Sequence, residues 1–565
     1  MVNGTSAALR LIVVPIWVTT LIFWAVAPVA VAAMVLLAWL VPIPGRVTAA
    51  ATRALERPLV PAVVGVLTSL ALWWMWGSLR PLPVFHDDAA YLFQAETFAH
   101  GRWAYPPPPL PEFFEQAHVL VTPVYAAKYF PGHALVLAPG VWVGLPGLMA
   151  LLLGGVTAAV LYALARRASN AWVALGAWLL WLTARGEPDL PVRWRPSYLS
   201  EATTGMCWMV GWWCLWRWRE TGRARWLVGL SVCTAWQGIT RPLTAIAFAL
   251  PAAAVILRVV HRERRWGQLV APMVVGGVIL ALLPLWSYET VGSWRTTPYA
   301  LYSRFYMPSE RAGFGAVAAQ PERPLVPEVR CAESQWRTVH SAHRPEKLPQ
   351  IVGERLLHVD RDFFPLARSG LLLFAVLGVV GLRSAAWLPV VTAVALVGCY
   401  LAYAHPPSWT VYYVEMQPVL AFLTALGLWQ VAVSGSSLEH GARELGHDSA
   451  ERARRAAFLM AVLAVLPVAW SLDGLRADER MGAEYRSAFR GQVARLPGDR
   501  LIVFVRYQSS IQCPSLIYNE PDLASARVWV VNDRGADDAR LMEMAPDRTA
   551  YLYIDRNRTF MRLGR

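Results

Sequence analysis

Two adjacent carboxylates, Asp87 and Asp88, carry the clearest signal for chemistry in this sequence. They follow a long apolar run and open a stretch whose apolar side chains repeat at helical spacing. This spacing predicts a short amphipathic helix lying on the membrane surface. Aspartate is a favoured helix cap, so one acid could serve only that purpose. The other would remain free as a general base that deprotonates an acceptor hydroxyl or amine.

Three more candidates follow in the same segment of the chain: His118, Lys128 and Tyr129. An isolated ammonium just outside a bilayer suits a lipid phosphate, although a lysine there can equally be a snorkelling surface residue. We therefore name Lys128 as a candidate contact for a lipid phosphate, with His118 and Tyr129 as candidate binding residues beside it.

Polar residues also interrupt the later apolar runs. Arg195 and Glu201 stand at the start of one such run, where a glutamate favours the helix dipole and could instead contact an acceptor or a metal. Arg241, before Pro242, lies at the depth of a lipid headgroup and could bind phosphate bidentately or simply form a turn. Glu415, at the start of a late run, is a second acid that could approach the site.

Metal binding is an open alternative for the acidic pair. Asp87 and Asp88 could hold a divalent cation, but such cations take several oxygen ligands and the sequence identifies no others. The six cysteines have no metal-ligand spacing. Cys331 and Cys513 lie in polar regions and could pair if both face an oxidising compartment.

Composition shows what must position these residues. Of 565 residues, 56% are hydrophobic and 16% are charged, which is atypical of a soluble globule. Apolar runs such as 59–79 and 269–288 are long enough to cross a bilayer. The runs predict an all-α polytopic membrane protein with about 11 to 13 transmembrane helices. The net charge of +14 comes from arginines between these runs, as in cytoplasmic loops, so nucleic acid is not an expected partner.

The arginine clusters orient the chain. If they are cytoplasmic, loops 80–145 and 289–368 lie on the opposite side within a membrane module spanning 1–473. Residues 474–565 differ, because β-type runs at 501–505, 526–531 and 550–554 alternate with helix-compatible segments. They predict a small extracytoplasmic α/β domain without a Gly-rich phosphate loop.

The residues around the acidic pair resemble a known family. Asp87-Asp88-Ala-Ala-Tyr91, a Gly-Arg-Trp turn and Lys128-Tyr-Phe-Pro-Gly are similar to the first periplasmic loop of GT-C glycosyltransferases, and most similar to bacterial glycosyltransferase family 39. The superfamily includes protein O-mannosyltransferases and the aminoarabinose transferase of lipid A. The resemblance implies a GT-C-like fold, catalysis at Asp87 or Asp88 and a donor-phosphate contact at Lys128. It leaves open which aspartate is the base, because the family often has Asp-Glu here.

The resemblance also implies a reaction and a location. A sugar would pass, with inversion, from a polyprenyl-phosphate donor to a glycan, lipid or protein acceptor. The protein would lie among the lipids of the bacterial inner membrane, with its site facing the periplasm. The alternatives are a polytopic transporter or flippase of a lipid-linked glycan and a noncatalytic envelope assembly protein.

Overall fold

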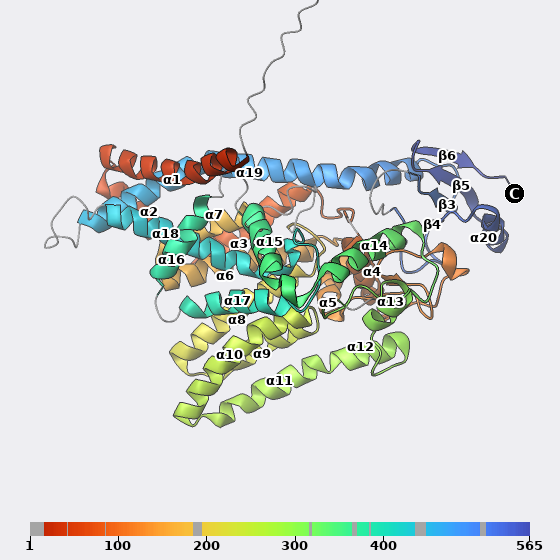
Figure 1. Cartoon of the computed structure of the whole chain (residues 1–565), viewed down its shortest axis with the longest axis horizontal. Helices are drawn as coiled ribbons and strands as arrows, with labels where there is room; N and C mark the ends of the chain where they lie inside the picture. The colour runs from red at the N-terminus through yellow and green to blue at the C-terminus, as the bar shows by residue number, and fades with distance from the viewer. Residues whose placement is uncertain are drawn as a thin grey trace, which may run out of the picture.

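The computed structural model describes residues 16–41, 43–84, 86–184, 195–315, 319–363, 370–382, 386–435, 448–508 and 516–564. Most helices run along the longest axis of the molecule, and the C-terminal sheet lies at one end of it (Figure 1). Cys331 is disulfide-bonded. Cys513 lies outside the described residues, so its predicted pairing with Cys331 stays a prediction.

Apolar helices form the body of the molecule. Among the described residues, five helices are long and apolar enough to cross a membrane, or six if the bent pair α2 (Gly45–Leu55) and α3 (Val60–Trp76) forms one span. The five spans are Leu148–Ala168, Pro242–Glu263, Trp266–Val291, Thr410–Val433 and Glu451–Ala494. The chain is thus mostly helical, and the expectation of 11 to 13 crossings stays a prediction.

The helices that build this body come from the whole length of the chain. They are α1 (Ile16–Leu40), α5 (Pro131–Trp142), α6 (Leu148–Ala168), α7 (Ala171–Leu182), α8 (Glu201–Thr221), α9 (Arg225–Gly238), α10 (Pro242–Glu263), α11 (Val270–Leu280), α12 (Leu282–Val291), α16 (Leu372–Val380), α17 (Trp387–Tyr400), α18 (Gln417–Gly435) and α19 (Asp448–Ala494). Their shared core is aromatic, with Trp208 and Phe248 fully buried.

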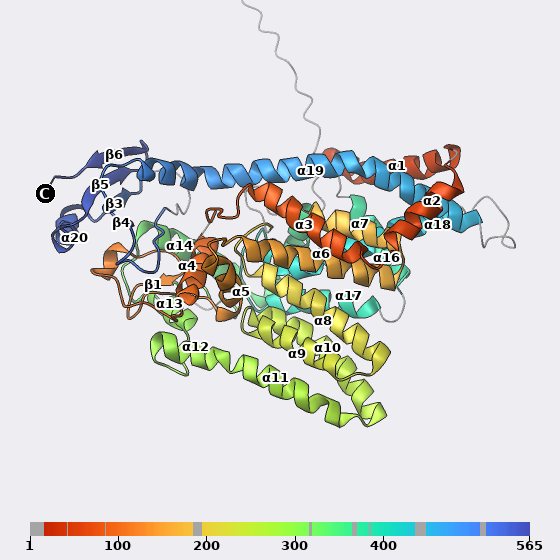
Figure 2. The ribbon, with the colours of Figure 1, turned by 180° about the vertical axis from the view of Figure 1, so that it is seen from behind.

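Small residues allow α3 and α6 to pack closely, as Figure 2 shows. A Cβ added at Gly155 would lie 2.8 Å from the carbonyl oxygen of Gly65. Close backbone approach through glycines is a common basis of helix association in membranes, where burial of apolar surface supplies little driving force.

One end of this body carries the functional segments, and we call it the α4 end. It holds α4 (His86–Ala99), the short antiparallel pair β1 (Val119–Leu120) and β2 (Ala126–Ala127), α13 (Pro298–Tyr306) and α14 (Pro327–Ala342) (Figure 2). α15 (Leu348–Phe363) follows α14 in the chain and packs on the core of the helical body through Val359 and Phe363. The opposite end, which we call the basic end, carries the arginines that close α6, α8 and α10. The segments of the α4 end come from both predicted loops, 80–145 and 289–368, which therefore lie together.

The expected surface position of the helix after Asp87 is wrong. α4 occupies the predicted stretch, but it is covered on both sides. Ala90 and Phe93 pack in a cluster with the C-terminal sheet, while Tyr91 and Leu92 pack beside Tyr198. The apolar repeat that suggested contact with lipid therefore meets protein, because distant segments of the chain close over it.

The C-terminal segment forms a mixed four-stranded sheet in the order β4-β3-β5-β6. β3 (Leu501–Arg506), β4 (Val528–Asn532) and β5 (Thr549–Ile554) are parallel, as their apolar runs suggested, and the exposed β6 (Thr559–Arg562) adds an antiparallel edge. The last turns of α19 cover one face of the sheet. α20 (Asp538–Met544) and the α4 segment cover the other.

Two connections make the sheet continuous with the body. α19 is a single helix of 47 residues that passes through the boundary predicted at residue 473. The second connection is Asn532, the last residue of β4. Its side chain donates to the backbone carbonyls of Phe113 at 3.1 Å and Glu115 at 2.7 Å. The α4 segment and the sheet thus share both a core and a buried polar contact.

Replacing Asn532 by Ala should loosen this junction. The change leaves two buried carbonyls without their donor, which costs about 1–3 kcal/mol of stability. The thermal midpoint of the purified protein should fall, and proteolysis between α19 and β3 should accelerate. Asn557→Ala, in an exposed turn, serves as the matched control. Equal behaviour of the two variants would contradict the junction.

Candidate functional site

The two adjacent aspartates have different surroundings. Asp88 is 2% exposed, and its carboxylate accepts backbone N–H bonds from Val84 at 3.2 Å and Tyr198 at 3.0 Å. Burial and the neighbouring Glu479 raise the pKa of Asp88 to about 8. Asp88 therefore joins the turn before α4 to the turn before α8, and both of its oxygens are already used.

Asp87 faces the other way. Its side chain is 43% exposed, and the Tyr129 hydroxyl donates a hydrogen bond to its Oδ1 atom. Burial, together with the charge of Asp87, raises the pKa of Tyr129 well above its usual value, so the phenol stays a donor. The Tyr129 ring is in turn stacked on Tyr91 of α4, with 4.3 Å between centroids. Asp87 is thus an oriented carboxylate with access to a substrate.

His118 lies beside Asp87, with 3.8 Å between Nε2 and Oδ1. Burial lowers the pKa of His118 well below its usual value, and the charge of Lys128 adds to this effect. The imidazole is therefore neutral near pH 7. Its backbone N–H donates to the Tyr302 hydroxyl at 2.8 Å, and within the described part of the chain its Nδ1 atom makes no hydrogen bond.

Glu328 of α14 connects this part of the site to the C-terminal sheet. Its Oε1 atom lies 2.9 Å from His86 Nδ1 and accepts the Ala117 N–H at 3.2 Å. Its Oε2 atom accepts from the Tyr507 hydroxyl at 3.4 Å. The residues next to Asp87 and His118 in sequence are therefore held by one buried carboxylate.

Lys128 is fully enclosed rather than exposed. Its Nζ atom lies 2.5 Å from Glu310 Oε2 and about 5 Å from the ring centroids of three tyrosines, which are Tyr129 at 5.2 Å, Tyr299 at 4.9 Å and Tyr302 at 5.1 Å. The Tyr299 hydroxyl donates to the second oxygen of Glu310 at 2.7 Å. The ammonium is thus stabilised by a carboxylate and by aromatic faces.

Arg241 is also paired with acids. Its Nη1 atom lies 2.6 Å from Glu201 Oε1 and 3.9 Å from Glu415 Oε1. Each glutamate has a second oxygen that makes no hydrogen bond among the described residues. The guanidinium carbon is 5.2 Å from the ring centroid of Tyr412, which lies 5.5 Å from that of Tyr403. The Tyr403 hydroxyl donates to Glu310 at 3.5 Å. The group formed by Arg241, Glu201 and Glu415, which we call the Arg241 cluster, therefore adjoins the cage of Glu310 and tyrosines around Lys128.

Arg195 takes a different position from the other candidates. It lies over the Trp181 ring at 4.1 Å and donates to Gln417 Oε1 at 2.5 Å. Together with Glu201 it lines a cavity of about 30 Å³, large enough for little more than a water molecule. Arg195 therefore borders the Arg241 cluster from within the helices and does not face Asp87.

The structure brings together most of the residues that the sequence singled out. Asp87, His118, Tyr129 and Lys128 are neighbours, and Arg241 with Glu201 adjoins them through tyrosines. Sequence reasoning missed Glu310 and Glu328. Both lie in the 289–368 loop, 182 and 242 residues from the partners they hold. The only local signal for Glu310 is the aromatic series before it, and Glu328 has no such signal in its neighbouring residues.

The described residues around Asp87 and Asp88 do not supply the further ligands that a metal ion would need. Within the described ranges, no group of three or more His, Cys, Asp or Glu side chains is placed to hold a metal ion. Asp88 also directs both oxygens at backbone N–H groups. The divalent cation considered from sequence therefore finds no ligand set around this pair.

The chain is structurally similar to several solved structures at low sequence identity. These include ArnT from Cupriavidus metallidurans bound to undecaprenyl phosphate (TM-score 0.45, 16% identity, covering 88% of this chain and 94% of that one). They also include the arabinosyltransferase EmbB from Mycobacterium smegmatis (TM-score 0.42, 14% identity, covering 81% of this chain and 44% of that one). A third is the oligosaccharyltransferase AglB from Archaeoglobus fulgidus (TM-score 0.39, 11% identity, covering 87% of this chain and 69% of that one).

At these identities the similarity concerns the fold alone. The sequence matches no protein-family model, and it matches no curated protein. The narrower resemblance to glycosyltransferase family 39 stays a prediction.

The raised pKa of Asp88 predicts a dependence of stability on pH. Between about pH 4 and pH 8 the folded protein retains a proton that the unfolded chain has lost, so this group's contribution to stability falls as pH rises. Asp88→Asn does not titrate. Its stability deficit relative to the wild type should therefore be largest near pH 5 and should shrink towards pH 8, by up to about 1 kcal/mol per pH unit.

Thermal midpoints of the two proteins in detergent, measured from pH 5 to pH 8, test this dependence. Asp499→Asn, at an exposed position, should differ from the wild type by a constant amount. A gap between wild type and Asp88→Asn that is constant with pH would show that Asp88 is ionised in the folded protein.

Proposed function

We propose that this protein is a GT-C type glycosyltransferase that moves a sugar from a polyprenyl-phosphate donor to an acceptor, with Asp87 as the general base. The observation that carries the proposal is the division of labour within the acidic pair. Asp88 is committed to backbone N–H groups, whereas Asp87 is partly exposed and oriented by Tyr129. This arrangement suits a base that must meet a substrate while its own position is fixed.

The proposed reaction is a single displacement. Asp87 takes the proton of an acceptor hydroxyl or amine, whose oxygen or nitrogen attacks the anomeric carbon of the donor sugar. The bond between that carbon and the phosphate oxygen breaks, and the electron pair leaves with the polyprenyl phosphate. The configuration at the anomeric carbon inverts. Phosphate is a good leaving group, so no paired general acid of the kind used in glycoside hydrolysis is required.

The donor phosphate is assigned to Lys128 and Arg241, in line with their chemistry. Each cation forms an ion pair with a carboxylate, Glu310 for Lys128 and Glu201 for Arg241. We propose that these carboxylates keep the cations charged and oriented until the phosphate takes their place. His118 and Tyr129 would then border the sugar next to Asp87, and Arg195 would support the Glu201 side from within the helices.

The proposed location is the cytoplasmic membrane of a bacterium, with the α4 end facing outward. Arginines at the far ends of α6, α8 and α10 support this orientation, because basic residues flank membrane helices on the cytoplasmic side. A lipid-linked donor would reach the site laterally from the outer leaflet. The acceptor would be an extracytoplasmic glycan, lipid or protein.

Asp87→Asn should abolish most of the transfer activity. Loss of a general base lowers kcat by about 10²–10⁴-fold, while donor binding should change little. Asp88→Asn, compared at equal amounts of folded protein, should stay within about tenfold of the wild type, because Asp88 does not touch the reacting atoms. The measurement is sugar transfer from a synthetic polyprenyl-phospho-sugar in proteoliposomes. Equal retention of activity by both variants would remove the catalytic assignment.

Glu310→Gln should strengthen the response to phosphate. Removing one partner of a buried ion pair destabilises the ligand-free protein by about 3–5 kcal/mol and leaves Lys128 without its anion. Added polyprenyl phosphate should then raise the thermal midpoint of Glu310→Gln more than that of the wild type.

Glu333→Gln provides the control for this comparison. Glu333 is a buried glutamate paired with Arg337, and it accepts hydrogen bonds from Ser309, the residue next to Glu310, without contacting Lys128. The control therefore perturbs the same segment but leaves the anion of Lys128 in place. Its variant should respond to polyprenyl phosphate as the wild type does. A thermal shift of Glu310→Gln no larger than that of the control would place the phosphate away from Lys128.

A further inference from the structure

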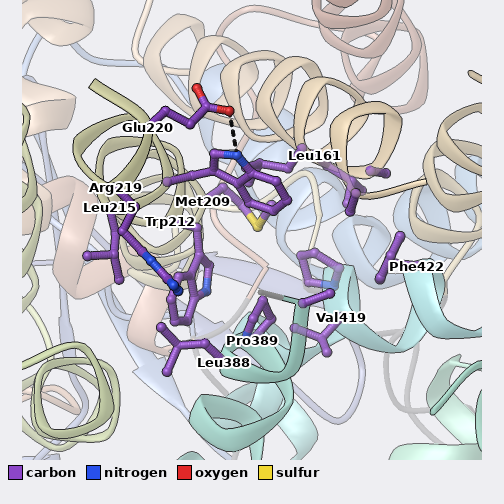
Figure 3. Close-up of a pocket in the computed structure, with 16 residues that line it drawn as sticks. Leu161, Met209, Trp212, Leu215, Arg219, Glu220, Leu388, Pro389, Val419 and Phe422 are labelled. Carbon is purple, nitrogen blue, oxygen red and sulfur yellow. Dashed lines mark hydrogen bonds between the residues drawn. The ribbon is translucent and has the colours of Figure 1, made fainter. Parts of the chain in front are cut away.

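A second candidate binding site lies near the basic end of the helices, away from Asp87. α6, α8, α17 and α18 enclose a cavity of about 300 Å³ there, within the range of small-molecule sites. Figure 3 shows Arg219 and Glu220 on one side of this cavity and Val419 and Phe422 on the opposite side. Apart from this charged rim, its lining is almost wholly apolar. We call this cavity the apolar chamber.

A more polar cavity adjoins it. This second space, of about 220 Å³, shares Ala168, Ala386 and Phe422 with the apolar chamber and is also lined by Ser169 and Asn170. We call it the polar chamber. Asn170 caps α7, and its side chain accepts the first free N–H groups of that helix. The positive end of the α7 dipole therefore lies beside the polar chamber, where negative charge is favourable.

Within the described ranges, the charged residues at the rim of the apolar chamber include one cation that is not paired. Glu220 is bound by Arg167 at 2.7 Å, by Arg217 at 2.9 Å and by the Trp216 indole at 2.8 Å. Its neighbour Arg219 makes no hydrogen bond or ion pair within the part of the chain that the structure describes. Among the described residues that line the apolar chamber, Glu220 is the only carboxylate, and it is neutralised, while the guanidinium of Arg219 remains free to bind an anion.

We propose that the two chambers bind one anionic phospholipid from the leaflet at the basic end. One acyl chain fills the apolar chamber, the glycerol ester region enters the polar chamber, and the phosphate binds Arg219. Adjacent apolar and polar spaces with a free cation at the rim match an amphiphile with a negative head. This proposal is independent of the proposed function, because its site lies near the other end of α6 and α8.

Other ligands match the two chambers less well. A pure hydrocarbon would fill the apolar chamber but would leave the polar chamber and Arg219 unused. A water-soluble anion would contact Arg219 but would gain nothing from the apolar lining. The surrounding arginines also favour anionic over zwitterionic lipids, by about 1 kcal/mol per basic residue near a membrane surface.

Competition between two lipids tests the proposal. The purified full-length protein is equilibrated with equal amounts of phosphatidylglycerol and phosphatidylcholine of identical acyl chains, and retained lipid is counted by native mass spectrometry. The wild type should retain phosphatidylglycerol preferentially. Arg219→Gln should reduce this preference about fivefold, which corresponds to the loss of one cationic contact. Arg223→Gln, at an exposed arginine just beyond the end of α8, should not change it.

A second variant tests the apolar chamber itself. Leu164 lines the chamber and is only partly buried, so Leu164→Trp adds volume there while the core remains intact. This variant should lose retention of phosphatidylglycerol while keeping the thermal midpoint of the lipid-free wild type. Equal retention of the two lipids by the wild type, equal effects of Arg219→Gln and Arg223→Gln, or full retention by Leu164→Trp would each overturn the proposal.

Discussion

The candidate site depends on one buried carboxylate that is assigned no chemistry. Asp88 accepts the N–H groups of Val84 and Tyr198, which are 4 and 110 residues away in the chain. These two bonds fix the start of α4 against the start of α8. They thereby also set the direction of the side chain of Asp87, the residue before Asp88. An acid that is spent on the backbone thereby defines where its neighbour points.

The rest of the site follows a common electrostatic rule. Lys128 and Arg241 are buried cations, and each one is stable in that position because a glutamate accompanies it. Tyrosines lie between the two pairs, and Tyr299 and Tyr403 hydrogen-bond to Glu310. A site of this kind stores positive charge without exposing it to water. An anionic ligand can then exchange with a carboxylate of similar geometry instead of meeting a bare cation.

The local patterns were predictable, and the long-range contacts were not. Apolar runs located most of the apolar helices and the three parallel strands, because these features depend on residues a few positions apart. β6 was missed because most of its side chains are exposed and leave no apolar run. The buried position of α4 was missed because its covering sheet lies more than 400 residues later in the chain. Glu310 and Glu328 were missed for the same reason, since their partners lie in another loop.

The shared core between α4 and the sheet also bears on how the protein is made. Phe93 and Phe113 pack with Ile502 and Phe504, so the first part of the site waits for the last part of the chain. During synthesis, the helices enter the membrane while the apolar side chains of α4 still lack their cover. A chaperone or protease would meet an unfinished site throughout that interval. Completion of the sheet is therefore a natural checkpoint, after which the acidic pair is held in its final geometry.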